Sequence, residues 1–319
     1  MTITARIDKV THIPASHLMP DPPAPRSVKI ELTGRCNYKC GFCALRTRGR
    51  QPKRADDMKL AFFKRITREM HAAGVVEIGL FYLGEPLMSA NLTVEACDYL
   101  KNELGMPYVF LTTNGSLATD EVLQRLMAAG LDSLKFSINA CDDTQFAEIM
   151  GVKPSLYTKA LQAVRSARRI RDENGYTTRL YASSIQYDGE QEQRMAALVA
   201  AHVAPFVDEH YYLPLYSMGA VATEREEELG YRPTAGNQGR IGGLVAPLPC
   251  WSAFTEGHVR HDGQMSLCCF DADGRFRVGD LHEHSFMEIW HSAKFQAVRR
   301  AHLGKDVSGT VCEDCVAYG

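Results

Sequence analysis

Apolar and polar residues alternate along the chain with two different periods. Short runs rich in β-branched and aromatic residues are followed by longer segments in which apolar residues recur every three or four positions, as on one face of a helix. The pattern predicts an α/β fold, an open, partial (β/α)6 barrel of the TIM type with helices outside a parallel sheet. The expected strands are 28–32, 77–82, 108–112, 133–138, 179–185 and 210–215, and the expected helices are 60–73, 92–103, 120–129, 157–174 and 191–201.

The pattern differs outside these six units. Residues 1–27 are rich in proline and are expected to form an extended lead-in before the barrel core of 28–216. Residues 217–249 are polar and rich in glycine, as in a linker or lid, and a shorter unit follows over 250–319. The sequence His-Asp-Gly at 261–263 favours a hairpin in that last unit. We therefore expect a barrel followed by a small C-terminal domain.

Composition and charge narrow the possible partners. Hydrophobic residues make up 45% of the 319 residues, charged residues 23%, and the formal net charge is −2. This balance argues against a nucleic-acid partner, because such proteins usually carry a basic surface. The sequence has neither a signal peptide nor an apolar run long enough to span a bilayer, so we expect no membrane partner and a cytoplasmic location. Thiols stay reduced there, so ten cysteines indicate metal binding rather than disulfides.

Three cysteines closely follow the first expected strand. Cys36, Cys40 and Cys43 stand in the stretch CNYKCGFC. Three thiolates on one loop can bind three irons of a [4Fe–4S] cluster and leave the fourth iron open to the amino and carboxylate groups of a methionine moiety. A zinc site or three unrelated core cysteines would be the alternative, but structural zinc usually has four ligands, and the sequence has no fourth Cys or His nearby. The position also fits, because reactive groups of barrel enzymes lie on the loops after the strands.

Four further cysteines belong to the C-terminal unit. Cys250 opens this unit, Cys268 lies on the far arm of an expected hairpin, and Cys312 and Cys315 form a CxxC at its end. Four thiolates can complete a [4Fe–4S] cluster with no open iron, and the same four would also bind zinc. On chemistry alone both possibilities stay open.

The first cysteine loop resembles the signature of the radical S-adenosylmethionine (SAM) superfamily, CxxxCxxC with an aromatic residue, here Phe42, before the last cysteine. The stretch Leu83-Gly84-Glu85-Pro86, after the second expected strand, resembles the GGEP motif of that family, with Leu83 in place of the first glycine. The resemblance implies that the backbone and carboxylate of this motif hold the amino group of SAM.

Further matches to the same family continue to about residue 216. By resemblance, the SAM pocket is lined by Thr113, Asn114, Ser137, Asn139 and Ser183, with Ser137 and Asn139 near the ribose and methionine ends of SAM. For each of these residues, the alternative is an ordinary role in a turn or at a strand end.

The C-terminal unit resembles the SPASM/Twitch region of radical SAM proteins, through Gly-Asp-Leu at 279–281 and Glu-Ile-Trp-His-Ser at 288–292. A full SPASM domain has seven cysteines and two auxiliary clusters. Four cysteines match here, which implies the shortened Twitch form with one auxiliary [4Fe–4S] cluster rather than zinc. Cys269 is expected to pack in the core, because neighbours on a strand point to opposite faces; the alternative is that it replaces Cys268 as ligand. The remaining two, Cys97 and Cys141, are expected to be ordinary buried cysteines.

The resemblance also implies the chemistry. A cluster reduced by an external donor, such as flavodoxin or ferredoxin, passes one electron to SAM, and the resulting 5′-deoxyadenosyl radical takes a hydrogen atom from the substrate. An auxiliary cluster with four protein ligands has no iron free to bind substrate. This ligand count favours a role as electron acceptor, and hence a net oxidation.

The substrate is expected to be a small hydroxylated molecule. The C-terminal cysteine spacing is similar to that of radical SAM dehydrogenases acting on aminocyclitols or sugars in natural-product biosynthesis, and the short lead-in leaves no room for a leader-binding domain. The alternatives are a sugar-nucleoside decarboxylase, a maturase that crosslinks, epimerises or oxidises a ribosomally made peptide, and a tRNA-modifying enzyme. A dehydrogenation also needs a base, to which the sequence assigns no residue. Candidate substrate contacts are His210, Tyr212 and Tyr216 near the sixth strand and Arg46 and Arg48 after the cysteine loop.

Overall fold

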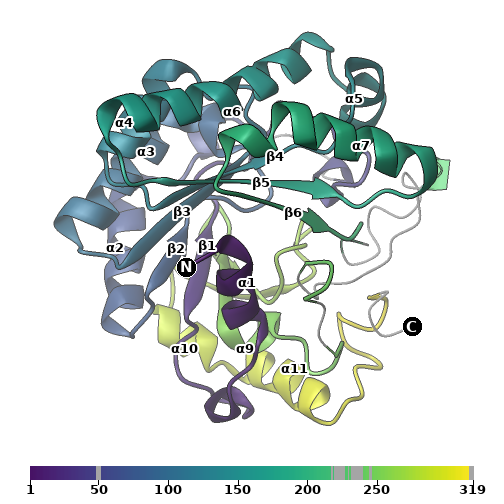
Figure 1. Cartoon of the computed structure of the whole chain (residues 1–319). Helices are drawn as coiled ribbons and strands as arrows, with labels where there is room; N and C mark the ends of the chain where they lie inside the picture. Colours follow the sequence, from purple (N-terminus) through teal and green to yellow (C-terminus); the bar gives the residue numbers. More distant parts are fainter. Residues whose placement is uncertain are drawn as a thin grey trace.

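The computed structural model describes residues 1–47, 52–216, 218, 227–228, 230, 240–243 and 246–315. In these parts one sheet has the strand order β6-β5-β4-β3-β2-β1-β7-β8-β9. Strands β1 to β6 pair in parallel, which confirms the predicted α/β fold (Figure 1). The strands are β1 (Ser27–Ile30), β2 (Glu77–Gly79), β3 (Tyr108–Thr113), β4 (Ser133–Ser137), β5 (Arg179–Ile185), β6 (Glu209–Leu213), β7 (Glu256–Val259), β8 (Gln264–Ser266) and β9 (Arg277–Asp280).

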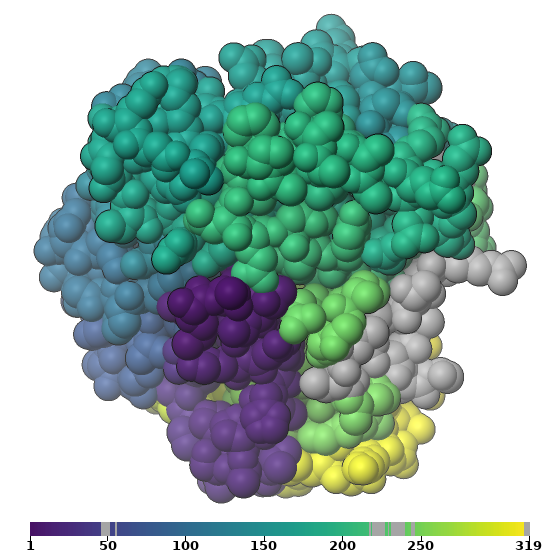
Figure 2. Space-filling model, in the orientation of Figure 1, coloured from purple at the N-terminus to yellow at the C-terminus, as the bar shows by residue number. Residues whose placement is uncertain are grey.

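The N-terminal segment was predicted to be extended, but this prediction is wrong for its first part. The segment begins with helix α1 (Ile3–Thr11). All prolines follow this helix, and Thr2 caps its first turn. The first helical N–H donates to the Glu209 carboxylate at the start of β6 (2.8 Å), and the Arg6 guanidinium donates to Glu77 at the start of β2 (2.9 Å). Helix α1 therefore closes the barrel at the end where its strands begin. Figure 2 shows the N-terminal segment, in purple, on this face of the molecule.

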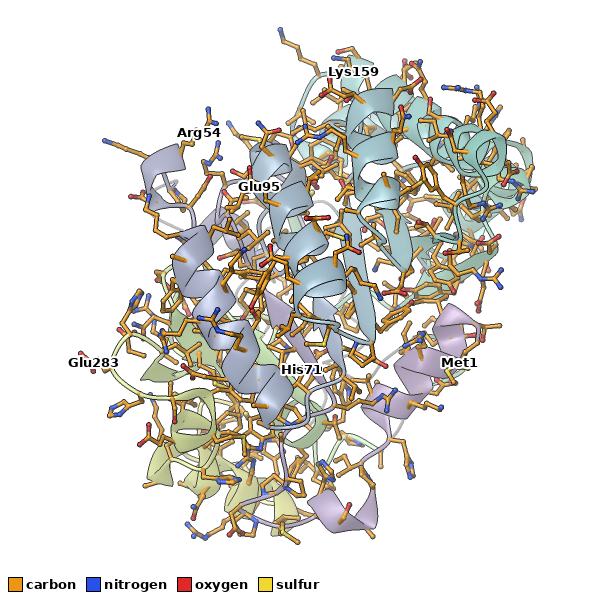
Figure 3. All side chains as sticks on the ribbon, turned by 90° about the vertical axis from the view of Figure 1, so that its left-hand side faces the viewer. Met1, Arg54, His71, Glu95, Lys159 and Glu283 are labelled. Atoms are coloured by element: carbon orange, nitrogen blue, oxygen red, sulfur yellow. The ribbon has the colours of Figure 1, made fainter. Side chains whose placement is uncertain are left out.

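Helices follow the barrel strands and cover the outer face of the sheet. In Figure 3, α2 lies next to α3, with α6 beyond them; His71, Glu95 and Lys159 mark the three helices. Helix α5 was not predicted, and α3 continues into a π-helical turn, Tyr99–Glu103. The helices after α1 are α2 (Leu60–Ala72), α3 (Ala90–Asp98), α4 (Asp120–Ala128), α5 (Asp143–Met150), α6 (Ser155–Asn174), α7 (Gly189–His202), α9 (Ser252–Thr255), α10 (Phe286–Trp290) and α11 (Ala293–Leu303).

The C-terminal unit does not form a separate sheet. Strand β7 pairs in parallel with β1, and the antiparallel strands β8 and β9 extend the same sheet beyond it. The β7–β8 hairpin turns where the sequence predicts it, with Gly263 in the left-handed region at φ +81°. Strand β1, which leads into the first cysteine loop, is thus also the strand to which the C-terminal unit is attached.

Some sequence predictions concern residues that the structure does not describe. Most of the expected linker or lid at 217–249 lies outside the described residues, as do Arg48 and the side chain of Arg46. Among the described helices, none combines the length and the apolar content that crossing a membrane requires.

Candidate active site

The loop after β1 presents Cys36, Cys40 and Cys43, and backbone hydrogen bonds hold it against the end of α5. The backbone N–H groups of Lys39 and Gly41 donate to the last carbonyls of α5, at 2.9 and 2.8 Å. The three thiols are not in disulfides and are half-buried. Burial raises the pKa of the Cys36 thiol to about 12, so metal binding there would have to displace a proton.

The buried Glu85 carboxylate joins the loops that follow β2 and β3. It accepts hydrogen bonds from the Thr113 hydroxyl (2.7 Å) and from the backbone N–H groups of Asn114 (2.8 Å) and Leu87 (3.1 Å). Burial raises the pKa of Glu85 to about 6, although these hydrogen bonds oppose the shift. The Asn114 amide also donates to the side chain of Asn37 in the cysteine loop (2.9 Å). The network thus ties residues expected to hold SAM to the cysteine loop.

Gly84 lies where the loop after β2 approaches the loop after β1. Its N–H donates to the Glu31 carboxylate (3.0 Å), and a Cβ at this position would lie 2.2 Å from the carbonyl oxygen of Thr33. No side chain fits at that distance, so glycine is required for the two loops to pack together. The next residues are fixed as well, because Pro86 is buried and begins a short 3-10 turn.

A small cavity lies between the cysteine loop and the ends of β3 and β4. Its lining includes Cys40, Asn114, Ser137 and Asn139, so three of the expected SAM residues share it with an expected cluster ligand. Two other candidates lie elsewhere: Ser183 is buried on β5, and Phe42 is half-buried against the core. Which SAM atoms each residue contacts stays a prediction.

The four C-terminal cysteines, Cys250, Cys268, Cys312 and Cys315, line one cavity. Cys269 instead lines the cavity inside the barrel, so the two adjacent cysteines face different cavities. This arrangement favours Cys268 over Cys269 as the fourth ligand. Within the described ranges, no three His, Cys, Asp or Glu side chains are grouped as ligands of a single metal ion.

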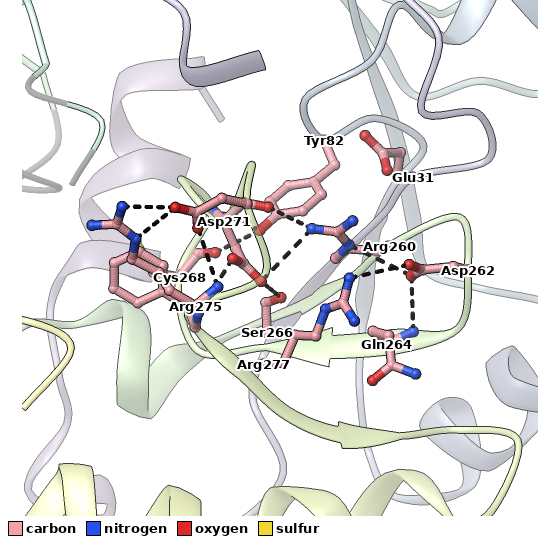
Figure 4. A network of polar contacts seen from close by, with 12 residues as sticks. Glu31, Tyr82, Arg260, Asp262, Gln264, Ser266, Cys268, Asp271, Arg275 and Arg277 are labelled. Atoms are coloured by element: carbon pink, nitrogen blue, oxygen red, sulfur yellow. Dashed lines mark hydrogen bonds and ion pairs between the residues drawn. The ribbon is translucent and has the colours of Figure 1, made fainter. Parts of the chain in front are cut away.

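A polar network fixes the loop that carries Cys268 (Figure 4). The Tyr82 hydroxyl donates to the Cys268 carbonyl (2.6 Å), and Arg260 donates to the Asp271 carbonyl (2.9 Å). The Asp271 carboxylate accepts a hydrogen bond from the Ser266 hydroxyl. Tyr82 stands just before the Leu-Gly-Glu-Pro stretch, so this network connects the expected SAM motif with an expected auxiliary ligand.

The barrel encloses a cavity of about 220 Å³. Helix α1 lines the cavity on one side, and the segment after β8 lines it toward the C-terminal domain. Side chains that point into it include Phe81, Phe110, Lys135, Tyr211, Tyr216 and Cys269.

Two lysines line this cavity. Lys29 on β1 is paired with Glu256 on β7 (2.8 Å), which also binds His258 (2.8 Å). Lys135 on β4 lies with its Nζ 5.8 Å from the ring centre of Tyr211, and no described carboxylate raises its pKa. Burial, and then the charge of Lys29, lowers the pKa of Lys135 to about 8. Lys135 is thus an amine that can exchange a proton near neutral pH inside the barrel.

Two of the three substrate candidates near β6 do not line this cavity. Tyr211 and Leu213 line the cavity, and side chains alternate along a strand, so His210 and Tyr212 face the opposite side of the sheet. There His210 forms a hydrogen bond with a serine of β5 (3.0 Å). Tyr216, after the strand, does line the cavity.

The sequence interpretation missed the charged residues inside the barrel. Lys29 and Lys135 each lie between two apolar neighbours in their strands, and a lysine at such a position is rarely placed inside a fold without a polar role, so a signal was present. Cys269 lines the cavity rather than only packing in the core. Cys97 is buried as expected, whereas Cys141 is half-buried.

Two family models match the chain. The radical SAM superfamily matches residues 30–182, and the iron–sulfur cluster-binding domain called SPASM matches residues 250–316. Among curated relatives, a GTP 3′,8-cyclase of Synechococcus sp. (strain CC9902) is 26% identical over 284 residues, covering 77% of this chain and 80% of the relative. A PqqA peptide cyclase of Xanthomonas campestris pv. campestris (strain 8004) is 26% identical over 322 residues, covering 92% and 80%.

Solved structures share the fold. SuiB of Streptococcus suis bound to precursor peptide SuiA has a TM-score of 0.65 and 16% identity, covering 98% of this chain and 72% of SuiB. BtrN in complex with AdoMet and 2-DOIA has a TM-score of 0.57 and 17% identity, covering 91% and 92%. The three-cysteine loop and the four-cysteine cavity fit the cofactors that the matched domains imply. The chain therefore belongs to the radical SAM superfamily and carries a SPASM iron–sulfur cluster-binding domain, with SAM and [4Fe–4S] clusters as its cofactors.

Proposed function

We propose that this radical SAM enzyme oxidises a small hydroxylated substrate, such as an aminocyclitol or a sugar, to a carbonyl compound. The observation that carries the proposal is the cavity of about 220 Å³ inside the barrel, which both Phe81, near the SAM motif, and Cys269, next to an auxiliary ligand, line. Pockets for drug-sized ligands measure about 300–1,000 Å³, so this cavity suits a smaller molecule.

In this proposal the chain binds one cluster and SAM at the loops after β1 and β2, and a second cluster in the C-terminal unit. When bound, SAM and the three-cysteine cluster supply the 5′-deoxyadenosyl radical, after reduction by a donor such as flavodoxin or ferredoxin. The Glu85 network holds the loops around SAM, and the shortened Twitch-type domain over 250–319 holds one auxiliary [4Fe–4S] cluster. The proposed ligands are Cys36, Cys40 and Cys43 for the first cluster and Cys250, Cys268, Cys312 and Cys315 for the second, with Gly84, Pro86, Thr113, Asn114, Ser137 and Asn139 around SAM.

Lys135 is the base that the oxidation needs. Removal of a hydrogen atom from the carbinol carbon leaves a radical that still carries its hydroxyl proton. That proton would pass to the neutral Lys135 amine. The auxiliary [4Fe–4S] cluster, which Cys250, Cys268, Cys312 and Cys315 would hold, would supply the one-electron acceptor that formation of the carbonyl product requires. Because its pKa lies at about 8, a useful fraction of Lys135 is neutral at working pH. For Lys29, burial lowers the pKa, but the charges of Glu256 and Cys269 and the hydrogen bond to Glu256 together raise it by more, so Lys29 stays protonated.

The solved relatives support more than one substrate class. BtrN binds 2-DOIA, and SuiB binds a precursor peptide. The small size of the cavity, which α1 lines on one side, favours a small substrate for this chain.

Cys269 favours a second candidate, epimerisation of the same class of substrate. A protonated Cys269 in the cavity wall can return a hydrogen atom to a carbon radical, and return from the opposite face inverts that carbon. The hydrogen bonds of Cys269 with Cys268 and His258 lower its pKa to about 5, so this thiolate must take up a proton before it can act. The thiyl radical then takes up one electron and one proton from an external donor and solvent, so the substrate undergoes no net oxidation and each turnover consumes one SAM.

Product analysis separates the candidates. Reduced enzyme is incubated with SAM and with aminocyclitols and sugars that carry deuterium at each carbinol carbon. Oxidation predicts deuterated 5′-deoxyadenosine and a ketone in equal amounts, whereas epimerisation predicts an epimer that has gained solvent hydrogen. The Lys135→Met variant should still transfer deuterium to 5′-deoxyadenosine but should no longer form the ketone. The Cys269→Ser variant should still form any ketone but should no longer form an epimer. Turnover of peptides alone would overturn the proposed substrate class, and the triple variant Cys36/Cys40/Cys43→Ala serves as the inactive control.

A further inference from the structure

His302 lies beside two of the four auxiliary cysteines. It belongs to the last turn of α11, is only 1% exposed, and lines the same cavity as the cysteines. The Cys250 backbone N–H donates to its Nδ1 (3.2 Å), and its Nε2 lies 3.4 Å from the Cys312 sulfur. The ring therefore bridges a backbone group of one expected ligand and the sulfur of another.

These two contacts determine the tautomer of His302. A backbone N–H can only donate, so the Nδ1 atom that it contacts must be an acceptor without a proton. The proton of the neutral ring then resides on Nε2, the atom that faces the Cys312 sulfur. In a doubly protonated ring, the Nδ1–H group of His302 would face the backbone N–H of Cys250, and two donors cannot form a hydrogen bond.

Hydrogen bonds of a neighbouring arginine hold the helix that carries this ring in place. Arg299, one turn earlier in α11, is fully buried and donates to the carbonyls of Ala253 (2.8 Å) and Trp290 (2.7 Å). Ala253 belongs to α9, which directly follows Cys250. The helix that carries His302 is thereby fixed to the segment that presents Cys250.

We propose that His302 donates a hydrogen bond to the Cys312 thiolate of the auxiliary cluster and so raises the reduction potential of that cluster. A donor to a cluster sulfur stabilises the reduced state, which carries one more negative charge. His302 is a positioning residue that acts through Cys312. The inference rests on the proposed set of four ligands, and it adds to the proposed function a reason why this cluster accepts an electron.

The test uses the Cys36/Cys40/Cys43→Ala background, which retains only the auxiliary cluster, so a redox titration followed by electron paramagnetic resonance reports one centre. His302→Asn keeps an amide oxygen near the position of Nδ1 but has no donor at that of Nε2, whereas His302→Gln can extend an N–H to Cys312. We expect the Asn variant to lower the reduction equilibrium constant about tenfold, which is about 59 mV for a one-electron couple. The Gln variant should retain most of the potential. His291→Asn, in which a ring bound to the Pro22 carbonyl (2.8 Å) is replaced, is the control and should leave the potential unchanged.

A spectroscopic measurement gives a second outcome. Pulsed resonance in H₂O and D₂O should detect an exchangeable proton coupled to the reduced cluster in the parent and the Gln variant, and no such proton in the Asn variant. An unchanged potential and proton coupling in His302→Asn at full iron content overturns the inference. Loss of iron from that variant also overturns it, because His302 would then be a ligand or a structural support. Absence of a [4Fe–4S] signal in the background itself overturns the ligand set, whereas a failed substrate screen leaves this test unaffected.

Discussion

The Tyr82 hydroxyl donates a hydrogen bond of 2.6 Å to the backbone carbonyl of Cys268. Tyr82 ends the segment that leads into the SAM motif, and Cys268 is the hairpin ligand proposed for the auxiliary cluster. One partly buried hydrogen bond thus connects the loop after β2 with the loop after β8, two segments far apart in the sequence. The two proposed cofactor sites are therefore held in a fixed relation.

Replacing Tyr82 by Phe tests this connection. The variant leaves the Cys268 carbonyl without its donor, so we expect the free energy of unfolding to fall by about 1–2 kcal/mol. The resonance spectrum of the auxiliary cluster should change, while SAM cleavage persists. Tyr99→Phe is the matched control, since the Tyr99 hydroxyl also donates to a backbone carbonyl, that of Lys64 (3.2 Å), away from both sites. Equal spectra for the two variants would contradict the role of Tyr82.

Gly84→Ala tests the close approach of the two loops around SAM. A methyl group 2.2 Å from the Thr33 carbonyl oxygen forces the loops apart, so we expect a loss of about 2 kcal/mol or more in stability and a marked loss of SAM affinity. Equilibrium binding of SAM to the reconstituted protein and denaturant unfolding measure the two effects. Gly304→Ala, where the nearest backbone atom is 3.3 Å from the added Cβ, should be much milder. Normal SAM binding by Gly84→Ala would show that the loops can separate freely.

Lys135→Met should stabilise the protein at neutral pH. Burial, and then the charge of Lys29, lowers the folded-state pKa of Lys135 from 10.5 to about 8, so the unfolded chain holds this proton more tightly. The Lys135 charge therefore lowers the free energy of unfolding by its full amount below pH 8, and by less and less as the pH rises from 8 toward 10.5. We expect a gain of about 1–3 kcal/mol in unfolding free energy at pH 7, and a smaller gain at pH 10.

Lys101→Met provides the control for that measurement. Lys101 is paired with Asp132 at 2.8 Å, so its loss should not stabilise the protein at pH 7. A gain from Lys135→Met that is equal at pH 7 and pH 10 would show that packing, rather than the buried charge, is the cause.

Iron content distinguishes the two adjacent cysteines. Cys268→Ala should lose the auxiliary cluster and retain about four irons per chain, whereas Cys269→Ala should retain about eight. The reason is that Cys268 lines the four-cysteine cavity and Cys269 lines the barrel cavity. The reverse result would make Cys269 the ligand. Cys97→Ala, at a buried cysteine in α3, is the control for cysteine removal as such.

The six barrel strands could be predicted because each is a short apolar run between amphipathic segments. The inward face of β6 could not, since His210, Tyr211 and Tyr212 give polar and aromatic character to both faces of the strand. Helix α1 was missed because its apolar residues are buried against the mouth of a barrel that exists only in the folded chain.

Long-range contacts explain the rest of what the sequence did not indicate. The pairing of β7 with β1 joins residues far apart in the chain, and a local pattern carries no information on such a pairing. The first cysteine motif was readable because Cys36, Cys40 and Cys43 are close together in sequence, as are Cys312 and Cys315 in the second. The roles of Lys135 and His302 depend on which side chains meet in the fold, so they appear only in three dimensions.

The most direct test of the central claim is iron content together with SAM cleavage, measured on anaerobically reconstituted protein. We expect about eight irons per chain and reductive cleavage of SAM in the wild type, against about four irons and no cleavage in Cys36/Cys40/Cys43→Ala. About four irons in the wild type and none in the variant would contradict the auxiliary cluster, and with it the proposed oxidation. Cleavage of SAM by the variant would contradict the assignment of the first cluster.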